Sequence, residues 1–198
     1  MRNLVLALLA VVVVAVVALL CVAALRPDQM HVERSIDIAA PPAAVFAIVN
    51  DFHRFPEWSP WQGLDPAMKT DLSGPPSGHG AAYHWAGNDK AGEGRMTIDE
   101  SAPYTHIGIR LEFIKPFAST NLSAWEFTPT ATGTHVTWSF DGKSEFMMKV
   151  MGVFMDMDKA IGGEYAKGLG NLKRLAEGPP ASAAPADSSD AMVTPAEN

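Results

Sequence analysis

Residues 4–25 form an unbroken apolar run, LVLALLAVVVVAVVALLCVAAL, that contains no charged residue. As an α-helix at about 1.5 Å per residue, the run would reach roughly 33 Å, which is enough to cross the hydrocarbon core of a bilayer. A cleaved signal peptide is the alternative, but its apolar core typically has about 7–15 residues and ends at a small-x-small cleavage site. Val22-Ala23-Ala24 is a poor site of that kind. We therefore predict an uncleaved, single-pass membrane helix.

The charges around this helix leave its orientation open. Arg2 and the amino terminus on one side nearly balance Arg26 and Arg34 on the other, so the positive-inside rule favours neither direction. The linker that follows the helix can reach less than about 20 Å, which predicts a folded domain close to the membrane surface. From Gly178 onward the chain is small, polar and proline-bearing, a composition typical of disorder. The predicted organisation is a short tail at 1–3, the membrane helix at 4–25, a linker at 26–30, one domain at 31–177 and a disordered tail at 178–198.

The net charge of −7 is concentrated at the carboxyl end, where four acidic residues follow the last basic residue, Arg174. The body of the chain is only mildly acidic, and no basic patch interleaved with aromatic residues occurs. These features argue against nucleic acid as a partner. Cys21 is the only cysteine and lies inside the apolar run, so the sequence predicts no disulfide.

The rest of the chain changes between strand-like and helix-like periods. Residues 31–39 alternate, with Val32, Ile36 and Ile38 on one face, as a half-buried strand does. Pro41-Pro42 then begins a short helix, AAVFAIVNDF. Further alternating runs predict five or six antiparallel strands. These runs are 83–85, 96–98, 107–113, 125–127 and 136–140, with another candidate within 68–72.

From Phe146 to Leu175 the apolar period returns to three or four residues, which predicts a long carboxyl-terminal helix with candidate breaks near Gly152 or Gly162-Gly163. One strand, a short helical pair, a meander of strands and a long helix imply an α+β fold. Its single curved sheet would have its apolar face covered by the last helix. A space between such a sheet and its helix is suited to a small apolar ligand.

Several segments carry a resemblance to a known family: VERSIDIAAPPAAVFAIVNDFHRFPEWSPW, SGPPSGHGAAYHW, GEGRMTI, GTHVTWSFDG and GLGNLK. Over about residues 31–175 the chain resembles the polyketide cyclase/dehydratase branch of the START-like (SRPBCC) superfamily. The resemblance implies a helix-grip fold with a deep apolar cavity. It does not select one function, because the superfamily includes lipid carriers, ligand sensors, cyclases and proteins with no known activity.

Large side chains of inward parity are the candidate ligand-binding residues. Arg34 shares the parity of the apolar residues of its strand, so it would either reach the cavity mouth or anchor an acidic head group. The aromatic residues have ordinary core packing as their alternative role. The methionines of the last helix, Met147, Met148, Met151 and Met155, suit a pocket that accepts several apolar shapes. The candidate cavity residues are Arg34, Tyr83, Trp85, Phe113, Trp125, Trp138 and Met151.

The segment FPEWSPW places Trp58 and Trp61 three residues apart, on one side of a helical turn. The turn follows the first short helix and would close one end of the curved sheet. We therefore predict a structural role for both indoles, with a ligand clamp as the alternative.

Neither a metal site nor another cofactor is predicted. The six histidines lack the spacing of a metal site and have no cysteine partners, and no G-x-S-x-G motif occurs. Asn121-Leu122-Ser123 matches a glycosylation sequon but begins a predicted strand, so we discount it.

The leading hypothesis is a membrane-anchored domain that binds a lipid or other hydrophobic small molecule without catalysis. One alternative is a cyclase or dehydratase that uses Tyr83, His84 or Arg34 as acid, base or orienting group. Another is a structural or interaction role in the cell envelope. The sequence identifies no particular protein partner.

Overall fold

The computed structural model describes residues 2–144 and 146–178, without the side chains of Met147 and Met148. The predicted tail at 178–198 therefore lies outside the described residues, apart from Gly178. The domain is built on one seven-stranded antiparallel sheet in the order β1-β7-β6-β5-β4-β3-β2. The strands are β1 (Gln29–Ile38), β2 (Lys69–Ser73), β3 (Ala82–Ala86), β4 (Glu93–Ala102), β5 (His106–Lys115), β6 (Ser119–Thr130) and β7 (Gly133–Lys143).

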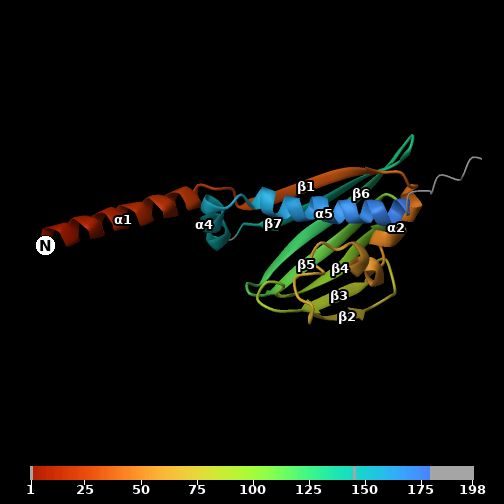
Figure 1. The fold of residues 1–198 in the computed structure, drawn as a ribbon, viewed down its shortest axis with the longest axis horizontal. Coiled ribbons are helices and arrows are strands. Elements are labelled where there is room, and N and C mark those ends of the chain that lie inside the picture. Colours follow the sequence, from red (N-terminus) through yellow and green to blue (C-terminus); the bar gives the residue numbers. More distant parts are fainter. Residues whose placement is uncertain (1, 145, 179–198) are drawn as a thin grey trace, which may run out of the picture.

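The helices lie at the two ends of this sheet and across one of its faces (Figure 1). The long apolar helix α1 projects away from the domain, and α5 lies across the curved sheet (Figure 1). This arrangement confirms the predicted α+β helix-grip fold. The helices are α1 (Arg2–Ala24), α2 (Pro42–Val49), the 3-10 turn η1 (Phe52–Arg54), α3 (Phe55–Trp58), α4 (Phe146–Phe154) and α5 (Met157–Glu177).

Strand register gives the sheet two distinct ends. Gln29, which follows α1 closely, pairs with Lys143 at the end of β7. Through the antiparallel ladders, the β5–β6 turn and the β3–β4 turn lie at the same end. We call this the proximal end, because it is the end nearest α1. The β4–β5 and β6–β7 turns lie at the opposite, distal end.

The short helices α2 and α3, with η1 between them, close the distal part of the fold. Phe46 of α2 packs edge to face against Phe127 of β6, with ring centroids 5.6 Å apart, and against Tyr104 in the β4–β5 turn at 5.7 Å. Phe55 and Trp58 of α3 are also buried. The proline-initiated helix and the FPEWSPW turn therefore fill one end of the sheet.

The carboxyl-terminal helix is interrupted, but not at the glycine pair that the sequence suggested. α4 ends at Phe154, and Asp156 caps a new helix by accepting a hydrogen bond from the Lys159 amide at 3.1 Å. Of the two candidate breaks, the one near Gly152 is close to the interruption between Phe154 and Met157, whereas the one at Gly162-Gly163 is wrong, since α5 runs through both. A side chain at position 162 would clash with Arg34, because a Cβ there would lie 2.0 Å from a guanidinium nitrogen.

Gly168 sets how closely α5 approaches the sheet, because a Cβ there would lie 2.8 Å from the Trp138 ring and 3.1 Å from Pro60. We expect Gly168→Ala to destabilise the fold by about 1–3 kcal/mol through overpacking. Gly170→Ala, in the same helix, meets nothing within 4 Å and should stabilise it by about 0.5–1 kcal/mol through helix propensity. Urea unfolding of the full chain in detergent, followed by tryptophan fluorescence, measures both. Equal effects of the two substitutions would contradict the assigned role of Gly168.

Candidate functional site

A cavity of about 830 Å³ lies between the concave face of the sheet, α3 and the start of α5. Its lining comes from β3 to β7, from the segment after α3, and from Met151, Ile161 and Tyr165. Six of the candidate residues predicted from sequence line it: Tyr83, Trp85, Phe113, Trp125, Trp138 and Met151. Strand alternation places the five that belong to strands, because residues of one parity share the concave face, whereas Met151 belongs to α4.

An aromatic stack forms the wall between the sheet and α5. Trp125 lies parallel to Trp138 with ring centroids 4.4 Å apart, and Trp138 lies parallel to Tyr165 at 3.7 Å. Trp58 and Trp61 each meet Trp138 edge to face at 5.7 Å. Both tryptophans of the FPEWSPW turn also line the cavity. They therefore occupy a position that both packs the core and faces the space.

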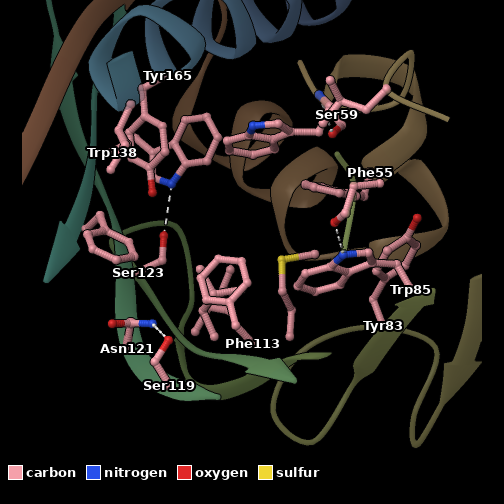
Figure 2. A pocket seen from close by; sticks show the side chains of 18 of the residues that line it. Phe55, Ser59, Tyr83, Trp85, Phe113, Ser119, Asn121, Ser123, Trp138 and Tyr165 are labelled. Carbon is pink, nitrogen blue, oxygen red and sulfur yellow. Dashed lines mark hydrogen bonds between the residues drawn. The ribbon is translucent and has the colours of Figure 1, made fainter. Parts of the chain in front are cut away.

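β6 turns three polar side chains into this apolar cavity. Ser119, Asn121 and Ser123 share inward parity, and Asn121 and Ser123 are each only 6 % exposed. The Trp138 indole donates to the Ser123 hydroxyl at 2.9 Å, and that hydroxyl donates to the Ser139 carbonyl at 3.1 Å. The Asn121 amide donates to the Ser119 hydroxyl at 3.2 Å. Figure 2 shows this polar stripe on one wall, with Phe55, Tyr83 and Trp85 on the other.

The polar stripe was missed in the sequence, where Asn121-Leu122-Ser123 was considered only as a sequon. Parity was the available signal. Trp125 and Phe127 predict the inward face of β6, and the same parity extends back through residues 123, 121 and 119. Leu122, of opposite parity, is 59 % exposed.

The two tyrosines of the lining stay protonated at neutral pH. Burial strongly raises the pKa of the Tyr165 hydroxyl, although the neighbouring Ser123 hydroxyl lowers it in part. Burial also raises the pKa of Tyr83, with a smaller opposing effect from Thr70. A tyrosine with a raised pKa can donate a hydrogen bond but is a poor general base.

Two buried polar atoms have no hydrogen-bond partner among the residues that the structure describes. They are the Trp58 indole nitrogen and the Tyr83 hydroxyl oxygen. Thr70 approaches Tyr83 without forming a hydrogen bond of ordinary geometry. Each unpaired buried donor costs about 1–3 kcal/mol.

Arg34 lies outside the cavity lining and holds α5 to β1. Its guanidinium pairs with the Asp158 carboxylate at 2.8 Å and donates to the Asp158 carbonyl at 3.1 Å. The bond from Arg34 keeps the pKa of the Asp158 carboxyl below its usual range. Gly162 leaves room for the guanidinium, which takes the place that a side chain would fill.

Within residues 2–144 and 146–178, the lining includes three lysines, at positions 90, 115 and 143, and no Asp, Glu, His or Cys. The lysines all belong to the proximal turns and strand ends. Within the described part of the chain, no group of three or more His, Cys, Asp or Glu residues is placed to hold a metal ion.

Comparison with known proteins gives a family match over most of the chain. The model of the family described as "Polyketide cyclase / dehydrase and lipid transport" matches residues 29–177. No curated protein matches.

Solved structures share the fold at low sequence identity. A protein of unknown function from Staphylococcus aureus superposes with a TM-score of 0.56 at 12% identity, over 75% of this chain and 94% of that one. The Aha1 dimer from Colwellia psychrerythraea gives 0.54 at 15% identity, over 75% and 96%. A protein from the dynemicin biosynthetic locus gives 0.52 at 20% identity, over 77% of this chain and 48% of that one.

Ser123 is expected to stabilise the wall of the cavity, because its hydroxyl is the acceptor for the buried Trp138 indole. Ser123→Ala would leave that donor unpaired and should lower the free energy of unfolding by about 1–3 kcal/mol. Thr120→Ala, on the exposed face of the same strand, is the matched control and should cost less. Urea unfolding measures both. An unchanged stability of Ser123→Ala would mean that the indole finds another partner.

Proposed function

This chain belongs to the polyketide cyclase/dehydrase and lipid-transport family, and we propose that it binds a lipid or other hydrophobic small molecule in its cavity without transforming it. We further propose that α1 anchors the domain in a membrane. The family match over residues 29–177 confirms the resemblance inferred from sequence. The ligand and the anchor are the parts that the proposal adds.

The observation that carries the proposal is the chemistry of the cavity lining. It is mainly aromatic and aliphatic, and its volume of about 830 Å³ lies within the range of about 300–1,000 Å³ typical of small-molecule sites. Burial of an apolar ligand there is favourable by about 25 cal/mol per Å². The stripe of Ser119, Asn121 and Ser123 adds a row of neutral hydrogen-bonding groups along the β6 wall. An amphiphile with a hydroxyl or carbonyl group would fit this arrangement in one orientation.

The same stripe is what favours the alternative of a cyclase or dehydratase, because polar side chains converge inside the cavity. Such chemistry needs a group that exchanges a proton near the working pH. Among the residues that the structure describes, no carboxylate or imidazole lines the cavity, and the lining tyrosines have a raised pKa. We therefore assign the stripe to orienting a ligand.

The membrane anchor rests on α1. It is the one helix among the described residues that is long and apolar enough to cross a bilayer, and none of its apolar window is buried in the domain. A core helix of a folded protein would instead be mostly buried. A signal sequence would pass the same test of length and composition, and the length of the apolar run favours the anchor.

Filling the cavity tests the ligand proposal. Leu111 lines the cavity, whereas Leu122 on the adjacent strand is exposed on the other face. We expect Leu111→Trp to remove a bound lipid by occupying its space, and Leu122→Trp to leave it in place. Native mass spectrometry of the full chain, released from detergent after purification from membranes, measures the lipid adduct.

Two results would contradict the proposal that the cavity holds a lipid. Adducts present equally in both variants and in the unsubstituted chain would be lipids that surround α1. Absence of any lipid adduct from the unsubstituted chain, purified from several membrane sources, would also contradict it.

A further inference from the structure

α4 exposes apolar side chains and buries its charged one, the reverse of a surface helix in water. Its only charged residue, Lys149, is 9 % exposed, whereas Phe146 is 50 %, Met151 42 % and Phe154 76 % exposed. Met155, just after the helix, is 51 % exposed. Surface helices of globular domains normally bury the apolar stripe and expose the charge. The reversed pattern requires an apolar medium or partner on the outer face of α4.

α4 is fastened to the end of α1. The two helices pack together (Figure 1). Lys149 pairs with Asp28 in the short connection after α1, and the Ser144 amide donates to the Asp28 carbonyl at 2.8 Å. Gly152 leaves space for Arg26, whose guanidinium would lie 3.1 Å from a Cβ at that position. The exposed face of α4 is therefore held beside the carboxyl end of the apolar helix.

Other exposed apolar side chains gather at the same end of the domain. Phe117 is 69 % exposed at the β5–β6 turn, and Ile114 is 45 % exposed beside it. Leu64 is 40 % exposed, and its segment is bound to the β3–β4 turn through Asn88, which donates to the Leu64 carbonyl at 3.4 Å. Large exposed apolar side chains grouped at one end of a domain mark an interaction site. The proximal surface, as we call it, consists of Leu64, Ile114, Phe117, Phe146, Met151, Phe154 and Met155.

The mouth of the cavity lies in this surface. Leu64, Phe117 and Met151 are exposed and also line the cavity. Strand register places the other lining residues of the rim, such as Met30 and Ser119, at the proximal end as well. The distal end is filled by α2 and α3. A ligand therefore enters from the side of the domain where α1 ends.

We infer that the proximal surface lies in the interface of the bilayer that α1 crosses, and that the cavity opens onto that bilayer. The ligand is then a lipid of that membrane, which enters between Phe117 and Met151 without passing through water. This inference rests on the proposed anchoring by α1. The occupant is a bilayer because the connection between α1 and β1 has only four residues, 25–28, which reach at most about 14 Å. The surface is thus fixed where the bilayer begins.

A fluorescent probe at single positions tests the contact. Cys21 is first replaced by Ala, and Phe117→Cys, Phe154→Cys and, as the distal control, Tyr104→Cys are each labelled with an NBD probe. Tyr104 is an exposed aromatic residue at the β4–β5 turn. The full chain is placed in phosphatidylcholine nanodiscs with or without a doxyl-labelled phosphatidylcholine. We expect a loss of NBD emission from doxyl lipid at positions 117 and 154, and none at 104.

Two results would overturn the inference. Probes at 117 and 154 that are no more quenched than the probe at 104 would place the proximal surface in water. Blue-shifted emission at 117 and 154 without doxyl quenching would show that protein, such as a second copy of the chain, covers this surface.

The result also separates this inference from the proposed function. Unquenched probes together with a lipid adduct that Leu111→Trp removes would refute the bilayer contact alone. Quenching at 117 and 154 in a chain that retains no lipid adduct would support the contact and refute the ligand alone. Circular dichroism of each labelled variant confirms that it is folded.

The rate at which a lipid enters the cavity from the bilayer gives a second readout. Phe117→Asp places a charge at the mouth, where transfer from the bilayer would have to pass it. We expect it to slow loading of an NBD-labelled fatty acid from nanodiscs at least about tenfold, as expected for losing the burial of one phenyl group. Tyr104→Asp is the matched control and should leave the rate unchanged. Equal rates in both variants and the unsubstituted chain would overturn entry at Phe117.

Discussion

The packing of α5 against one side of the sheet is the constraint on which the cavity depends. α5 packs mainly on β1, α2 and α3, and the stack of Tyr165 on Trp138 fixes it over the β1–β7–β6 side. The other side of the sheet, β3 to β5, curves around a region that this helix does not fill. Inward residues there, such as Met96 and Leu111, face the open space instead. A single helix on a twisted seven-stranded sheet thus produces both a dry core and a cavity.

The character of the cavity follows from the few polar groups that the strands turn inward. Burying a polar group is costly unless it is hydrogen-bonded, and burying an unpaired charge costs far more. Asn121 and Ser123 are neutral and are hydrogen-bonded within the wall, so β6 can bury both without burying a charge. Lysines appear only toward the proximal rim. This gradient, from neutral and apolar inside to charged at the rim, suits recognition of an amphiphile more than proton transfer.

Much of the fold could be predicted from the sequence, because strand alternation and helical period are local signals. The candidate β2 region and the short FPEWSPW helix are examples. Strand parity placed five of the seven cavity candidates in the lining, and the helical period placed a sixth, Met151. Arg34 could not be placed in this way, since its partner Asp158 lies 124 residues later and Gly162 makes the room for it. Glycine positions alone could not choose between the two candidate breaks in the last helix. The chain breaks near Gly152, where Asp156 caps α5, and Gly162 lies inside α5 because it makes room for Arg34.

α4 shows why sequence and fold must be considered together. Its apolar pattern is compatible with two environments, and only the fold distinguishes them. FMMKVMGVF is apolar on every side except at Lys149, and a helix of that kind is either buried or in contact with lipid. Sequence periodicity favoured burial against the sheet. In the fold Lys149 is buried and pairs with the exposed carboxylate of Asp28 in the linker, while Phe146 and Phe154 stay exposed beside the end of α1. An ion pair with an exposed partner is weak, so this pair and the packing of α4 against α1 together set which face of α4 points away from the domain and toward the medium that the cavity mouth meets.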